Sequence, residues 1–79
     1  MILEAILIEI LGDTAVETLD QLTDLVANHH GYTGKSKGRE LRNRIKRILQ
    51  DERFQQDIQK SSSYIELKLG RFKGTVDLS

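Results

Sequence analysis

The chain contains no cysteine, no proline and no tryptophan, and its aromatic residues are two tyrosines and two phenylalanines. Without cysteine, neither a disulfide nor a thiolate-bound metal can stabilise the fold. His29 and His30 have no third ligand clustered with them, so we expect neither a metal site nor a cofactor. They fall where a helix is expected to end, and a positively charged side chain at that end interacts favourably with the helix dipole. This structural role is favoured over a role as metal ligands. Packing of secondary structure must therefore supply the stability.

Long hydrophobic runs are also missing. The most apolar stretch, residues 2–11, is interrupted by Glu4 and Glu9, lacks a basic segment before it and is shorter than the ~20 residues that cross a bilayer. We therefore predict no membrane partner and an intracellular protein, cytoplasmic in a prokaryote and nuclear in a eukaryote. The 38% hydrophobic and 30% charged residues are typical of one globular domain, which we expect to span residues 1–79.

Positive charge is missing from the first part of the chain. Residues 1–30 contain six acids and no lysine or arginine, although the whole chain is formally neutral. Residues 31–53 contain eight cations and three acids, a local charge of +5. A neutral average would argue against a nucleic-acid partner, but this separation predicts one acidic and one basic surface.

Apolar periodicity and end signals predict three helices, over about 2–12, 18–30 and 37–51. Thr18 and Gln21 have the spacing of a capping box, in which the Thr18 side chain accepts from the Gln21 amide and Gln21 reaches back to the cap. We expect Ser36 to cap the third helix. That helix carries the strongest period in the chain, through Leu41, Ile45, Ile48 and Leu49.

After residue 51 the apolar period changes from 3.6 to 2. Phe54 and Ile58 alternate with polar residues, and Ile65, Leu67 and Leu69 continue this alternation further along the chain. We predict a C-terminal β-hairpin over about 53–69, and residues 72–78 either add a strand or pack as a tail. The fold class is therefore α+β, a three-helix winged helix-turn-helix.

Several stretches between residues 31 and 69 resemble known protein families. The third helix has the core Leu41-Arg42-Asn43-Arg44-Ile45, Phe54 follows it, and the serine-tipped hairpin ends in Tyr64-Ile65-Glu66-Leu67. In these features the chain resembles the HARE-HTH, linker-histone and forkhead winged helices. The lysine-rich tail of linker histones and the tryptophan common in forkhead wings are both missing. The resemblance implies DNA binding through the third helix and the wing, without implying a target sequence.

The side of the third helix opposite its apolar stripe carries long hydrogen-bond donors and no carboxylate. We predict that four of these donors enter the major groove of double-stranded DNA, namely Arg39, Asn43, Lys46 and Gln50. Three others are predicted to contact phosphates, namely Arg42, Arg44 and Arg47. Lys35 and Lys37, in the loop before the helix, would bind phosphate with backbone amides, and Lys60 at the hairpin tip would touch the sugar-phosphate backbone.

The same features also fit plainer interpretations. A charge run is commonly a solvated helix face, a lysine-bearing loop is commonly a polar loop, and a serine-rich tip is an ordinary turn. Winged helices also serve as docking domains, so the alternative function is a protein-interaction module or a homodimer that pairs acidic with basic surfaces. Single-stranded nucleic acid is a weaker option because few aromatic side chains are available for stacking. We expect no enzyme, because no nucleophile, base and orienting group are gathered together.

Overall fold

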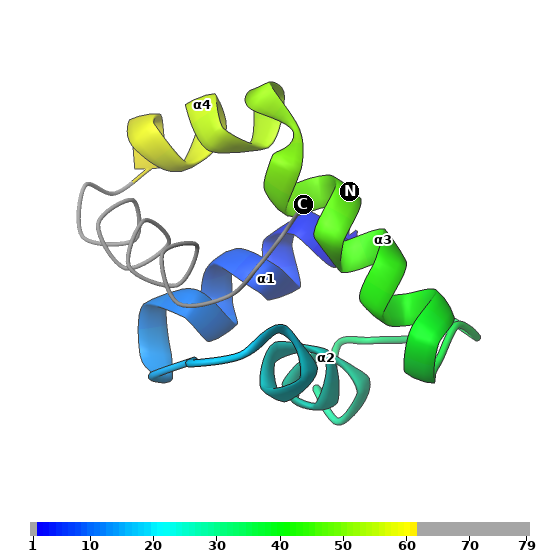
Figure 1. Ribbon diagram of the computed structural model, residues 1–79. Helices are drawn as coiled ribbons and strands as arrows, with labels where there is room; N and C mark the ends of the chain where they lie inside the picture. Colours follow the sequence, from blue (N-terminus) through cyan, green and yellow to red (C-terminus); the bar gives the residue numbers. More distant parts are fainter. Residues whose placement is uncertain (1, 62–79) are drawn as a thin grey trace.

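The computed structural model describes residues 2–61 of the chain, and helices are its only regular structure over that range. The helices are α1 (Ile2–Asp13), α2 (Leu19–Ala27), α3 (Gly38–Gln50) and α4 (Glu52–Ser61). In Figure 1, α2 lies at the bottom of the view and α4 at the top, while α3 runs along the right side and packs against both. No helix in this range is long and apolar enough to cross a membrane.

All four helices contribute apolar side chains to one core. The strong period of α3 places three of its four predicted residues there, and the fourth, Ile48, is half-buried against the core. Burial of each core side chain stabilises the fold by about 1.5–3 kcal/mol. α1 is buried on one side only, and its Ala5, Glu9 and Asp13 side chains face solvent. The core consists of Ile6, Leu7, Ile10, Leu11, Leu19, Leu22, Val26, Leu41, Ile45, Leu49, Phe54 and Ile58.

The capping box at the start of α2 is confirmed, with one difference. The Thr18 Oγ1 atom accepts a hydrogen bond from the Gln21 amide at 3.0 Å. The Gln21 side chain reaches back one residue further than expected, because its Oε1 atom accepts from the Glu17 amide at 3.0 Å. The first bond satisfies a backbone donor that the first helical turn leaves unpaired, and the second ties the residue before the N-cap to that turn. The start of α2 is therefore fixed by local side-chain contacts.

α2 ends at Ala27, three residues before the end predicted at residue 30. Asn28 closes the helix, and its side-chain amide donates to the Asp24 carbonyl at 2.9 Å. The His29 ring turns back onto α1, where its Nε2 atom lies 3.1 Å from the Glu9 carboxylate. The Nδ1 atom of the same ring accepts from the Gly31 amide at 2.9 Å. His29 thus closes the end of α2 against α1.

The start of α3 departs from the predicted cap. Lys37 occupies the N-cap position and makes no side-chain capping bond, while the Ser36 hydroxyl donates to Glu40 at 3.1 Å. Gly38, the first residue of the helix, has φ +57°, a backbone conformation that favours glycine. The first amides of α3 therefore have no side-chain cap from the N-cap residue.

The predicted α+β fold is wrong for the described residues, because α4 occupies the first arm of the expected hairpin. Phe54 and Ile58 are four residues apart, so the spacing that suggested alternation also places both on one side of a helix, where both are buried. The Asp51 carboxylate accepts from the Arg53 amide at 2.9 Å and caps the new helix. The rest of the hairpin, to residue 69, and the strand at 72–78 lie outside the described residues.

Candidate nucleic-acid interface

The outward side of α3 carries three exposed side chains at intervals of four residues, Arg39, Asn43 and Arg47, which we call the outer row. They lie opposite the buried stripe of Leu41, Ile45 and Leu49, so core packing directs them to solvent. Among residues 2–61, the structure gives the outer row no hydrogen-bond or ion-pair partner. The outer row is therefore available to an external ligand.

Arg42 is held by a carboxylate that the sequence did not indicate. Its Nε atom donates to the Asp20 carboxylate of α2 at 2.9 Å. The Arg42 side chain is 38% exposed and the Asp20 side chain 82% exposed. An ion pair this open to water contributes only about 0–1 kcal/mol, so a competing anion can displace it at small cost. Arg42 thus stays at the surface, with one carboxylate to compete against.

A shallow groove of about 500 Å³ runs between α2 and α3, beside the outer row. Asp20 and Asp24 lie on its α2 side, and we call these two residues the acidic wall. Gly38, Arg39, Arg42 and Asn43 line the same groove from α3. The outward side of α3 carries no carboxylate of its own, but here it faces two carboxylates of α2. The acidic wall will weaken any binding of phosphate to the neighbouring cations.

Arg44 points to the other side of α3, where it is fixed by the preceding loop. Its Nη1 atom donates to the Ser36 Oγ atom at 3.1 Å, and the Ser36 hydroxyl in turn donates to Glu40. The Tyr32 hydroxyl donates to the Ser36 carbonyl at 2.6 Å. These contacts tie the loop before α3 to the helix and to the Arg44 guanidinium.

The remaining predicted site residues are distributed unevenly. Lys35 and Lys37 are exposed in the loop just before α3, next to the amides of its first turn. Lys46 is half-buried, and both Lys46 and Gln50 take part in interactions of their own. Lys60 lies in the last turn of α4, whose far end points away from α3 in Figure 1. The structure therefore brings Lys35, Lys37 and the outer row together and leaves Lys60 apart from them.

Two kinds of contact at this surface differ in how far the sequence reveals them. Ser36, Glu40 and Arg44 follow one another at intervals of four, so a hydrogen-bonded series along a helix side is visible in the sequence. Asp20 and Arg42 are 22 residues apart and meet only because α2 packs on α3. No local sequence signal indicates that pair.

Metal chemistry has no candidate centre in the part of the chain that the structure describes, where no group of three His, Cys, Asp or Glu side chains could hold an ion. The two histidine rings stack on each other with centroids 4.4 Å apart. His29 uses both ring nitrogens in contacts within the chain, to Glu9 and Gly31. It therefore acts as a link between α1 and the loop that follows α2.

Comparison of the chain with protein-family models, curated proteins and solved structures gave no match. The function must therefore be argued from the surface itself.

Proposed function

We propose that the chain binds double-stranded DNA through the outer row of α3. The observation that carries this proposal is that Arg39, Asn43 and Arg47 are exposed at intervals of four residues and have no partner among residues 2–61. Lys35 and Lys37 lie beside the first turn of the same helix and extend the cationic surface. Arg42 and Arg44 flank the outer row and contact phosphates.

The dimensions and chemistry of the outer row suit a groove. The helix rises by about 12 Å along its axis between Arg39 and Arg47, and the major groove admits one α-helix. Arginine donates two hydrogen bonds to guanine and asparagine pairs with adenine, so the outer row can contact base edges as well as phosphates. Each cation that neutralises a phosphate also releases condensed counterions, which favours binding at low salt.

The acidic wall sets the expected strength. Asp20 competes with phosphate for Arg42, and Asp24 repels phosphate from the same groove. Both carboxylates lie at the surface, where water and salt screen them. We therefore expect affinity that is modest and falls steeply with salt.

A titration of fluorescently labelled duplex tests the proposal. Fluorescence anisotropy of the full chain with a duplex of random sequence is measured at about 50 mM and about 200 mM salt. We expect Kd values from submicromolar to micromolar at the lower salt and a loss of binding at the higher salt. Arg39→Ala and Arg47→Ala should each weaken binding about 5- to 10-fold and reduce the salt slope by about one.

Arg53→Ala is the matched control, because Arg53 is an exposed arginine on α4 outside the proposed surface. It removes the same charge and should leave the affinity within about twofold of the wild type. No binding at about 50 mM salt would remove the proposal, as would equal losses for Arg39→Ala and Arg53→Ala. Self-association of the chain without DNA, measured as its mass in light scattering, would favour the protein-docking alternative.

A further inference from the structure

An open pocket lies on the side of α3 away from the acidic wall, between α1, α3 and the loop that joins α2 to α3. Its volume is about 650 Å³, within the range of about 300–1,000 Å³ that small-molecule sites occupy. We call it the Arg44 pocket. Its lining consists of Leu3, Glu4, Tyr32, Thr33, Gly34, Arg44, Arg47 and Ile48.

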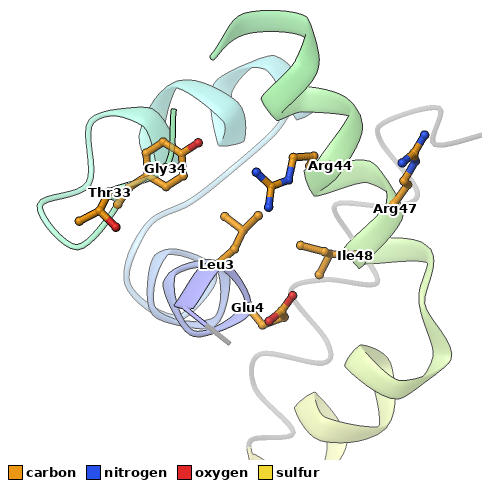
Figure 2. A pocket seen from close by; sticks show the side chains of 8 residues that line it. Leu3, Glu4, Thr33, Gly34, Arg44, Arg47 and Ile48 are labelled. Carbon is orange, nitrogen blue, oxygen red and sulfur yellow. The ribbon is translucent and has the colours of Figure 1, made fainter. Parts of the chain in front are cut away.

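The inner surface of the Arg44 pocket is an incompletely covered part of the core. Leu3, Tyr32 and Ile48 are half-buried and pack against the buried apolar cluster. In Figure 2, Leu3 of α1 and Ile48 of α3 point into the same space from opposite sides. An apolar group placed between them would remove their exposed surface from water, which is favourable in proportion to the area covered.

The loop forms a firm lip for this pocket. The Tyr32 ring lies so close to Gly34 that a side chain at that position would place its Cβ atom 2.7 Å from the Tyr32 hydroxyl oxygen. A larger residue at this position would force the Tyr32 ring to shift. The Tyr32 hydroxyl is also fixed by its hydrogen bond to the Ser36 carbonyl. The lip is thus held in place before any ligand arrives.

The polar group that faces the apolar surface is the Arg44 guanidinium. Figure 2 shows it extending from α3 toward Leu3. Its hydrogen bond to Ser36 uses one of its five N–H donors, among the contacts that the structure describes. Guanidinium presents its other donors in a planar fork that matches a carboxylate. The pocket therefore combines an apolar surface with an oriented anion receptor.

The charges at the rim favour an anion. Arg47 lines the pocket with its guanidinium turned outward, and Glu4 lies on the α1 side, away from Arg44 (Figure 2). Two arginines and one glutamate therefore line the pocket. Glu4 is in the first turn of α1, where the positive end of the helix dipole offsets part of its charge.

We propose that the Arg44 pocket binds a small amphipathic carboxylate. The carboxylate pairs with Arg44, Arg47 strengthens this attraction, and the apolar body lies against Leu3 and Ile48. This ligand site shares Arg44 and Arg47 with the surface proposed for DNA, but it is defined by the pocket and can be tested without nucleic acid.

Three probes of one shape separate the charge from the apolar contact. The full chain is titrated with 2-naphthoate, with neutral 2-naphthalenemethanol and with cationic 2-naphthylmethylammonium, and binding is followed by amide NMR shifts. We expect 2-naphthoate to bind with Kd near 1 mM or tighter, and the neutral probe to bind about 5- to 10-fold more weakly. The cation should bind most weakly. The largest shifts should fall on Thr33, Gly34 and Ile48.

Two variants locate the carboxylate. Arg44→Ala should lower the affinity for 2-naphthoate about 5- to 10-fold and leave the affinity for the neutral probe nearly unchanged. Because Arg44 also donates a hydrogen bond to Ser36, Arg47→Ala is the second variant, since the Arg47 side chain has no hydrogen bond or ion pair among the described residues to lose. It should lower 2-naphthoate affinity about twofold. Arg53→Ala should change nothing.

Several results would overturn the proposal. One is equal affinity for the anionic and neutral probes, and another is a set of shifts that avoids the lip and Ile48. Absence of saturable binding by every probe, as expected if another part of the chain or a second copy covers the pocket, would also overturn it. Equal affinity of Arg44→Ala and Arg53→Ala for 2-naphthoate would likewise overturn it, because the carboxylate would then not pair with Arg44.

Discussion

Asp20 competes with any external anion for the Arg42 guanidinium, because the two side chains are joined at 2.9 Å and both remain accessible to water. The contact costs little to break, so its effect on stability is small. Its effect on a phosphate ligand is larger, because the carboxylate both occupies Arg42 and repels the ligand. Binding measurements on Asp20 variants are therefore more informative than stability measurements.

Asp20→Asn should strengthen duplex binding about three- to tenfold at low salt, because it frees Arg42 and removes one repulsive charge. The measurement is the anisotropy titration of labelled duplex at about 50 mM salt. Asp13→Asn is the matched control, since it removes an exposed carboxylate at the end of α1 and changes the net charge equally. Equal gains for both variants would show that net charge alone, and not the contact with Arg42, governs binding.

Thr18 affects stability through one hydrogen bond. Thr18→Ala removes the Oγ1 acceptor of the Gln21 amide and should lower the free energy of unfolding by about 1 kcal/mol, as measured by urea denaturation. Thr18→Ser keeps the acceptor and should lie within about 0.5 kcal/mol of the wild type. If alanine and serine behaved alike at this position, the cap would contribute nothing to the stability of α2.

Among the elements, α3 was predictable and the first arm of the hairpin was not. The buried stripe of α3 repeats over Leu41, Ile45 and Leu49, long enough to separate a helical period from a strand period. The segment after it offered only Phe54 and Ile58, and a spacing of four fits both periods. The deciding features were the cap at Asp51 and the glutamines, which favour a helix over a strand.

The candidate site could likewise be predicted from the sequence only in part. The outer row follows from the helical period of α3 alone, so the sequence located Arg39, Asn43 and Arg47. The acidic wall and the Arg44 pocket arise where separate elements pack together, and a single sequence carries no signal for such contacts. Lys60 was placed at a hairpin tip, and the change of its segment to α4 separates it from the outer row.

A pair of substitutions at the exposed residue Gln56 of α4 distinguishes helix from strand by the sign of their difference. Gln56→Ala should leave the chain more stable than Gln56→Val by about 0.5 kcal/mol, because alanine favours helices and valine loses side-chain freedom there. Urea denaturation of both variants measures the difference. In a strand the order would reverse, since valine has the higher strand propensity. Greater stability of the valine variant would therefore indicate a strand at this position.

At the scale of the whole molecule, the separation of charge along the sequence is only partly a separation in space. The exposed acids of α1, such as Glu9 and Asp13, are on the N-terminal helix, while Asp20 and Asp24 line a groove with cations of α3. The basic surface is thus bordered on one side by acids and on the other by the Arg44 pocket. The outer row between them is the part of α3 that nothing in the described residues occupies.

An NMR titration of the labelled full chain with unlabelled duplex tests the role of the outer row most directly. The duplex has about 20 base pairs, long enough to cover a single-module interface, and the salt is about 50 mM. We expect the largest shifts in the Arg39 and Arg47 side-chain signals and the Asn43 side-chain amide, with little change in the outer residues of α4. Shifts concentrated on α1 or α4, or spectra unchanged by duplex, would contradict this account.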